Sequence, residues 1–196
     1  MQNITLMSNT AQSGGAVSID CDSYDRCQNI IRDSTFINNV ASVQGGAIYY
    51  NYRRPELSSF SFSNNTAPYG PDIGSYPVRI ASSDMIDEPI MITNVASGIV
   101  YNEILKLLLV DYDGQTMNLV NNSQIKISPV TSGASLIGVD YSVLVNGEAT
   151  FDTLQFVYAP GQDNIQFLAT SDLIDPYKVS YLSLPTNDSI DVSFRY

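Results

Sequence analysis

The chain is 196 residues long, carries a formal net charge of −11 with a pI near 4.1, and contains no histidine. This acidity works against binding to nucleic acid or to an anionic membrane surface, because both are themselves negatively charged. The lack of histidine excludes a Ser-His-Asp or Cys-His catalytic site within this chain and removes the commonest zinc ligand.

Three segments, 4–17, 34–48 and 61–73, repeat one pattern at intervals of 30 and then 26 residues. A large apolar residue is followed three positions later by an asparagine and then by an alanine. These aligned positions are Leu6, Phe36 and Phe62; Asn9, Asn39 and Asn65; and Ala11, Ala41 and Ala67. A repeat at a fixed interval predicts units that bury their apolar side chains by stacking on each other.

The pattern predicts short strands that pair in parallel from one repeat to the next. Equivalent asparagine side chains are expected to stack along the axis and to satisfy the amides of the turns. The pairs Gly14-Gly15 and Gly45-Gly46 predict tight corners in which a Cβ atom would clash.

This pattern resembles the polymorphic outer-membrane-protein repeat, which pairs a Gly-Gly-Ala-Ile element with a Phe-x-x-Asn element. Gly45–Ile48 and Phe36–Asn39 match both elements, and 14–17 with 6–9 match conservatively. The third copy departs at Gly70-Pro71-Asp72-Ile73, which predicts the end of the stack. The resemblance implies a short right-handed parallel β-helix and an adhesive or structural role at a cell surface, with no shared catalytic residues.

Cys21 and Cys27, separated by five residues, predict a structural disulfide and therefore an oxidising compartment. Asn-x-Ser/Thr sequons add candidate glycosylation sites and favour a secretory route; they occur at Asn3, Asn64, Asn121 and Asn187. We expect the loop between the two cysteines, and the stretch from Tyr50 to Ser59, to project as inserts.

Aromatic residues lie beside the pair of arginines in the second insert, and such side chains are favoured anchors for protein or sugar contacts. The candidate binding patch consists of Tyr49, Tyr50, Tyr52, Arg53 and Arg54. The alternative is that these tyrosines pack beside the stack.

Residues 1–80 are expected to form the repeat domain, 81–97 a cap and connector, and 98–196 a second domain. Asp84, Asp87 and Glu88 in the connector are weak calcium candidates, against which stands a solvated acidic linker. Asp111 and Asp113 begin like a calcium loop, but Asn122 stands where a glutamate is needed, so an Asp-Gly turn is expected.

From residue 98 onward, short apolar runs alternate with turn signals, and Asn146-Gly147 is the strongest hairpin signal. The expected strands are 103–112, 123–129, 136–145, 148–158, 164–171, 179–184 and 191–196. About seven strands in this length are typical of a β-sandwich. The segments Asp111–Gly114, Asn146–Phe151 and Ala159–Gly161 resemble a bacterial or filamin-type Ig-like module.

The sequence thus predicts an all-β chain: a short right-handed parallel β-helix followed by an Ig-like β-sandwich. The expected function is that of an extracellular structural or adhesion fragment of a larger surface protein, with a protein or glycan partner, no cofactor and no catalytic role. A membrane would be reached only through other parts of the protein. The alternatives are a glycan-binding or polysaccharide-degrading β-helix module and a calcium-stiffened matrix component.

Overall fold

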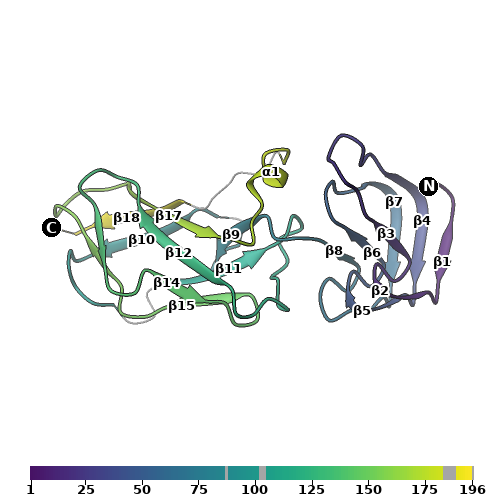
Figure 1. Ribbon diagram of the computed structural model, residues 1–196, viewed down its shortest axis with the longest axis horizontal. Helices are drawn as coiled ribbons and strands as arrows, with labels where there is room; N and C mark the ends of the chain where they lie inside the picture. The colour runs from purple at the N-terminus through teal and green to yellow at the C-terminus, as the bar shows by residue number, and fades with distance from the viewer. Residues whose placement is uncertain (87, 102–104, 183–188, 196) are drawn as a thin grey trace. The chain divides into compact units, whose positions relative to one another are not determined.

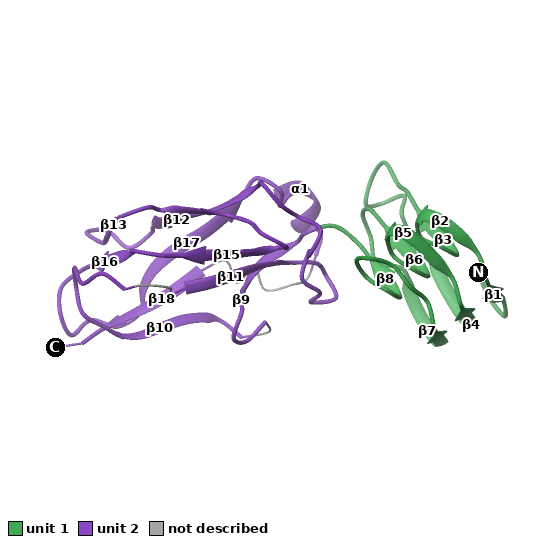
Figure 2. Ribbon diagram, turned by 90° about the horizontal axis from the view of Figure 1, so that it is seen from below, with its two compact units in different colours: residues 1–76 green, residues 77–196 purple. Residues whose placement is uncertain are grey.

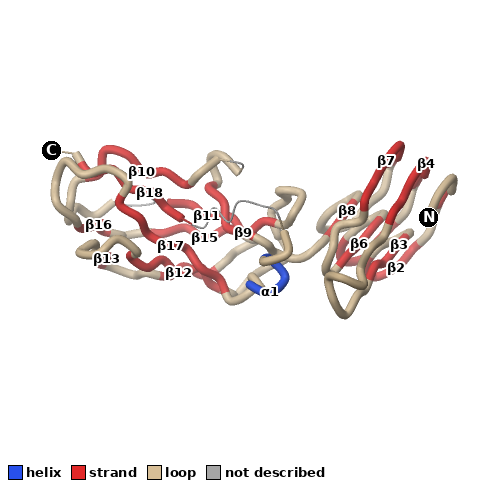
Figure 3. The backbone as a smooth tube through the Cα atoms, turned by 90° about the horizontal axis from the view of Figure 1, so that it is seen from above, coloured by secondary structure: helices blue, strands red, loops and turns tan. Residues whose placement is uncertain are grey.

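The computed structural model describes residues 1–86, 88–101, 105–182 and 189–195. It divides into two compact units, Met1–Tyr76 (unit 1) and Pro77–Tyr196 (unit 2), coloured separately in Figure 2. The chain is all-β apart from one short helix within the described residues (Figure 3). No described helix has the length and apolar character needed to cross a membrane.

Unit 1 consists of three repeats whose strands form shared parallel sheets; two sheets hold a strand from every repeat, and the third holds strands from repeats 1 and 2 (Figures 1 and 2). Repeat 1 holds β1 (Thr5–Met7), β2 (Thr10–Ser13) and β3 (Val17–Ile19). Repeat 2 holds β4 (Ile30–Ile37), β5 (Val40–Gln44) and β6 (Ile48–Tyr50), and repeat 3 holds β7 (Glu56–Ser63) and β8 (Ile73–Gly74). The sheets run β1-β4-β7, β2-β5 and β3-β6-β8, and every pairing between neighbouring strands is parallel.

The strand register confirms the alignment predicted from the sequence. Leu6 pairs with Phe36, and Phe36 pairs with Phe62. The ring centroids of Phe36 and Phe62 lie 5.2 Å apart. Phe36 is completely buried because it has a repeat on either side, whereas Leu6 and Phe62, which belong to the outer repeats, are only half-buried.

The predicted asparagine ladder is also confirmed. The backbone N–H and Nδ2 of Asn9 donate to Oδ1 of Asn39 at 3.1 and 2.9 Å. The same two groups of Asn39 donate to Oδ1 of Asn65 at 3.0 and 2.9 Å. Asn39 is completely buried, and the ladder satisfies its amide groups without water.

The residue before each ladder asparagine has a left-handed backbone. Ser8, Asn38 and Asn64 have φ angles of 57°, 52° and 54°. Asparagine tolerates this region better than most residues, because its short side chain can hydrogen-bond locally. The Asn-Asn pairs of repeats 2 and 3 therefore serve two purposes: the first residue makes the turn and the second enters the ladder.

Close approach of the backbones requires glycine at the corner. A Cβ atom built on Gly46 would overlap the carbonyl oxygen of Pro71, and one built on Gly15 would overlap that of Gly46. The expectation of a tight glycine corner is therefore confirmed. The third repeat has Pro71 at this position, where no further strand follows in the sheet.

The predicted length of the second insert, from Tyr50 to Ser59, is wrong. Tyr50 ends β6, and 56–59 belong to β7, which pairs with β4 from Ile30 onward. The physical reason is that β4 begins before the repeated motif, so its partner strand is extended by the same amount. The segment outside the strands is therefore limited to residues 51–55, which are half-buried or, at Pro55, buried.

Unit 2 contains a five-stranded sheet in the order β10-β18-β17-β12-β14, a three-stranded sheet in the order β15-β11-β9, and the pair β13-β16. The strands are β9 (Arg79–Ser82), β10 (Ile90–Val95), β11 (Leu105–Val110), β12 (Gln124–Pro129), β13 (Ser135–Ile137), β14 (Tyr141–Val143), β15 (Glu148–Phe151), β16 (Gln155–Val157), β17 (Ile165–Ser171) and β18 (Ser189–Phe194). Burial alternates along β12, β17 and β18, so these strands bury one face each. The buried rings of Phe156 and Phe167 meet edge to face with centroids 4.9 Å apart.

The predicted Asn146-Gly147 hairpin is confirmed. Val145 and Glu148 exchange backbone hydrogen bonds of 2.8 and 3.1 Å, and the two turn residues have φ angles of 52° and 78°. The expected Asp-Gly turn is confirmed as well. The carboxylate of the buried Asp111 accepts from the backbone N–H of Asp113 and of Gln115, each at 2.9 Å.

Other elements differ from the expectation. The segment expected to be a cap and connector, 81–97, carries β10, which pairs in parallel with β18. The preceding strand, β9, pairs with β11. Two expected strands are each split in two, at Gly138 and at Thr153, both of which have positive φ angles. The expected strand 179–184 is wrong over its described residues, since Val179 ends a helix, α1 (Pro176–Val179), and 180–182 form no strand. The helix forms because Asp175 caps it and Pro176 occupies its first position.

Candidate functional site

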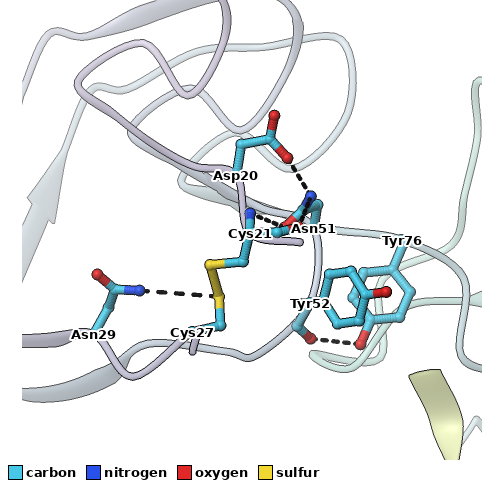
Figure 4. The surroundings of a disulfide bond; sticks show 7 residues. All are labelled: Asp20, Cys21, Cys27, Asn29, Asn51, Tyr52 and Tyr76. Atoms are coloured by element: carbon cyan, nitrogen blue, oxygen red, sulfur yellow. Dashed lines mark hydrogen bonds between the residues drawn. A yellow bond between two sulfur atoms is a disulfide. The ribbon is translucent and has the colours of Figure 1, made fainter. Parts of the chain in front are cut away.

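The loop between β3 and β4 is closed by a disulfide between Cys21 and Cys27, as predicted (Figure 4). The two Cα atoms lie 5.6 Å apart, within the usual range for a disulfide. Cys27 is completely buried, and its N–H donates to the carbonyl oxygen of Tyr24 at 3.1 Å. The bond therefore joins an exposed loop to the interior of unit 1.

Asn51 of repeat 2 fixes the loop to the neighbouring repeat (Figure 4). Its Oδ1 accepts from the N–H of Cys21 at 2.8 Å, and its Nδ2 donates to the Cys21 carbonyl oxygen at 3.0 Å. Nδ2 also donates to the carboxylate of Asp20. One amide side chain thus binds both backbone groups of Cys21, as a paired strand residue would.

Arg53 makes a second contact between repeat 2 and the loop. Its guanidinium carbon lies 5.2 Å from the centroid of the Tyr24 ring, within the range of a cation–π contact. Its Nη2 also lies 3.5 Å from a carboxylate oxygen of Glu56. The predicted patch residue Arg53 is therefore in contact with the disulfide loop.

The other residues of the predicted patch lie in different environments. Tyr50 is 1% exposed and meets Tyr76 edge to face, with centroids 6.3 Å apart, so its side chain belongs to the interior. The carbonyl oxygen of Tyr52 accepts from the Tyr76 hydroxyl at 2.5 Å (Figure 4). Tyr49, Tyr52 and Arg54 are half-buried. Contact of this patch with a partner stays a prediction. Tyr50 is buried and could only support the patch from the interior.

Burial raises the pKa of Tyr49 above its ordinary value of 10.0. The charge of Asp20 adds to this rise, and a hydrogen bond with Gln44 opposes it. The phenol hydroxyl therefore keeps its proton throughout the physiological range and can act as a neutral hydrogen-bonding group.

The most exposed charges of this region lie on the disulfide loop itself. Asp22 and Arg26 have side chains that are 78% and 80% exposed, and their charged atoms lie 3.9 Å apart. Together with Asp20 and Cys21 they line a shallow hollow of about 450 Å³. The patch predicted from the sequence lies on the arginine segment and does not include this acidic loop, although the loop carries three aspartates within six residues.

We call the surface formed by residues 20–27, Asn51 and Arg53 the loop surface. It combines a covalently closed backbone, exposed carboxylates and a stacked Tyr–Arg pair. Such a surface can bind a partner through charge-assisted hydrogen bonds without first ordering a mobile loop.

The candidate glycosylation sites fall on exposed turns where they are described. Asn3, Asn64 and Asn121 are exposed. The side chain of Asn121 is already engaged, since its Oδ1 accepts from the N–H of Asn146 at 2.9 Å. Asn187 lies outside the described residues.

The calcium candidates of the expected connector are only partly described. Asp84 and Glu88 are exposed and line a hollow of about 290 Å³, whereas Asp87 lies outside the described residues. Among the residues that the structure describes, no three His, Cys, Asp or Glu side chains group closely enough to hold a metal ion.

Comparison with known proteins gives one match. Residues 33–51 match the Chlamydia polymorphic membrane protein (Chlamydia_PMP) repeat. No curated protein and no solved structure matches the chain. The resemblance to this type of repeat is therefore confirmed over residues 33–51, the stretch that holds Phe36, Asn39 and the Gly45-Gly46 corner, while the Ig-like resemblance has no support from the comparisons.

Proposed function

We propose that this chain is a structural and adhesive segment of a cell-surface protein, without catalytic activity. The observation that carries the proposal is the match of residues 33–51 to a membrane-protein repeat, whose motif residues build the asparagine ladder and the glycine corner of unit 1. The disulfide supports the same reading, because such bonds persist in oxidising compartments outside the cytosol.

The architecture within this proposal is a short parallel β-helix followed by an Ig-like module. Parallel strands recur once in every repeat in two sheets, and in repeats 1 and 2 in a third sheet, to which repeat 3 adds isolated parallel bridges; this arrangement supports the β-helix. For unit 2, an Ig-like fold joins strands A, B and E in one sheet and strands G, F and C, with C′ added, in the other. The orders β9-β11-β15 and β18-β17-β12-β14 fit this scheme if β10, which pairs with the outer side of β18, and the separate pair β13-β16 are left without letters.

The loop surface is the part of the chain that we assign to partner binding. The side chains of Asp22 and Arg26 are strongly exposed, and the disulfide holds the loop in one shape. A protein or glycan partner that offers cationic or hydroxyl groups fits the three aspartates of the loop.

Surface location is tested with antibodies raised against residues 1–196 and applied to intact cells that express the natural protein. Labelling of intact cells is the expected result. Labelling only after the cells are permeabilised would contradict the proposal, and antibodies to a cytosolic protein of the same cells serve as the control.

Adhesion is tested by coating beads with the chain and measuring their attachment to cell surfaces and to a glycan array. We expect attachment to fall at least about tenfold for the double variant D22A/R26A, which corresponds to about 1.4 kcal/mol of binding free energy. The matched control is D172A, an exposed aspartate of unit 2. Equal attachment of the double variant and the wild-type chain would remove the loop surface from the proposal.

A further inference from the structure

The asparagine ladder of unit 1 has a direction. The Oδ1 atoms of Asn39 and Asn65 accept from the preceding repeat, and the Nδ2 groups of Asn9 and Asn39 donate to the following one. Nδ2 also donates back to a carbonyl oxygen of the preceding repeat, from Asn39 to Leu6 at 3.0 Å and from Asn65 to Phe36 at 3.1 Å. The two ends of the ladder are therefore chemically different.

The end at repeat 3 is closed by the chain itself. The Nδ2 of Asn65 donates to the carboxylate of Asp72 at 2.9 Å, where the earlier repeats donate to the next asparagine. Asp72 occupies the position of Ala47, as the pairing of Ile48 with Ile73 shows. A carboxylate only accepts hydrogen bonds, so Asp72 ends the ladder as a substitute for a further asparagine.

The end at repeat 1 is open. Asn9 is exposed, and its Oδ1 accepts no hydrogen bond from any described residue. The strands β1, β2 and β3 each pair on one side only. Beside them lies an apolar hollow of about 340 Å³, whose lining includes Val17, Ile19 and Ile31. Unpaired strand edges of this kind are templates for pairing with another chain.

We propose that this open edge of repeat 1 binds a partner polypeptide carrying the same motif, Phe-x-x-Asn followed by Gly-Gly-Ala. The contact between repeats 1 and 2 defines what the partner must supply. Its asparagine must donate N–H and Nδ2 to Oδ1 of Asn9, as Asn9 donates to Asn39. Its second glycine must lie over the Gly15 carbonyl and Thr10, as Gly46 lies over Pro71 and Thr66.

A second copy of this chain does not meet these requirements. Two repeat 1 edges placed face to face would set one Asn9 Oδ1 against the other, and both are acceptors. The opposite end of a second copy offers Asn65, whose Nδ2 is already taken by Asp72. The partner motif must therefore have a small apolar residue where this chain has Asp72, as repeat 2 does with Ala47.

The test uses the whole chain and synthetic peptides of residues 33–51, the stretch with the full motif. Four peptides are compared: the natural sequence, N39A, G46A and the control S42A, which changes an exposed residue outside the ladder. Fluorescence anisotropy measures binding, and hydrogen exchange of the chain locates it. Because every change is in the peptide, folding of the chain is not affected.

The expected result is saturable binding of the natural and S42A peptides with slowed exchange in β1, β2 and β3. Binding of N39A and G46A should be at least about tenfold weaker, a loss of about 1.4 kcal/mol for each change. Absence of binding, equal binding of all four peptides, or protection outside these strands would overturn the proposal. Self-association of the chain that protects the same strands without peptide would assign the edge to a second copy and would equally overturn it. None of these outcomes depends on where the natural protein resides, so they leave the proposed surface function untouched.

Discussion

At the scale of single residues, unit 1 depends on polar side chains in its interior. Asn39 uses its N–H, its Oδ1 and its Nδ2 at once, with the asparagines before and after it and with Leu6. Buried amides satisfied in this way fix one register, because a shift by one residue would leave several groups without partners.

The first prediction is that N39A strongly destabilises unit 1. The change leaves the donors of Asn9 and the Leu6 carbonyl oxygen without their partner, removes one of the two donors to Asn65 Oδ1, and empties the completely buried place of the Asn39 side chain. We expect a loss of about 2–4 kcal/mol in the free energy of unfolding. Chemical denaturation followed by hydrogen exchange of residues 1–76 measures it. The control S42A should change stability by less than about 0.5 kcal/mol, and a similarly small effect of N39A would show that the ladder contributes little.

The second prediction concerns the residue that ends the ladder. D72A removes the acceptor of the Asn65 Nδ2 group and should lower the stability of unit 1 by about 1–2 kcal/mol. D72N restores an acceptor oxygen at the same place and should recover most of that loss. If D72N and D72A melt at the same temperature, the carboxylate of Asp72 is not the cap that its position suggests.

At the scale of elements, the fold could be predicted where information is local or repeated. The triplicated motif was enough to align Leu6, Phe36 and Phe62, and the spacing of Cys21 and Cys27 was enough for the disulfide. The segment of β10 was predicted only as part of a cap and connector, and its pairing with β18 was not predicted, because β18 lies far along the chain and no local pattern indicates such a pairing. Parallel pairing between distant segments is set by the whole core rather than by the strand itself.

Only part of the candidate site could be predicted from the sequence, and the reason is similar. The sequence placed aromatic and cationic residues close together between 49 and 54, but it could not tell which of them face inward. Tyr50 is buried because it ends β6 on the inner side, while Arg53, beyond the strand, reaches the Tyr24 ring of the loop. The anchoring role of Asn51 depends on a contact between repeats, and a single residue gives no sign of it.

The third prediction is that the glycine corner tolerates no side chain. G46A forces a Cβ atom against the Pro71 carbonyl oxygen, and because both are backbone atoms, only a shift of the repeats can relieve the overlap. We expect the free energy of unfolding to fall by roughly 3 kcal/mol or more, which is at or above the upper end of the usual cost of overpacking a rigid interior. The control G98A meets no neighbouring atom and should lose only about 1 kcal/mol through its left-handed backbone. Equal effects of the two variants on thermal unfolding would contradict the stacking account.

The fourth prediction is that the disulfide stabilises the loop mainly by restricting the unfolded chain. For a loop this short, the double variant C21S/C27S should lose about 2 kcal/mol in the free energy of unfolding. Reduction of the wild-type chain with dithiothreitol should produce the same lowering of the melting temperature and should leave the variant unchanged. A reduced chain that melts at the oxidised temperature would show that Asn51 and the buried neighbours hold the loop without the bond.

At the scale of the whole molecule, the balance of charge and exposed apolar surface governs association. The net charge of −11 keeps copies apart at neutral pH. In unit 2, the edge strand β14 and its flanks expose alternate apolar side chains, with Tyr141 and Val143 both 49% exposed and Val145 63% exposed. Exposed apolar residues on an edge strand are a recognised route to self-association.

The fifth prediction follows from this balance. Light scattering of the chain should rise as the pH falls toward the pI near 4.1, because the repulsion between copies then disappears. The variant V143K places a charge on the edge strand and should scatter less than the wild type at the same distance from its own pI. S128K, on the neighbouring strand β12, is the control for charge alone. If both variants scatter light equally, the copies of the chain do not associate through the edge of β14.

The direction of the asparagine ladder also sets how such a protein can change in length. An inner repeat presents an acceptor on one side and a donor on the other, so a duplicated copy of repeat 2 could be inserted beside the original and would find both of its neighbours in register. A copy added after Asp72 would meet a carboxylate in place of an asparagine. Gene duplication can therefore lengthen this repeat array from within, while its last repeat, with its cap, stays in place.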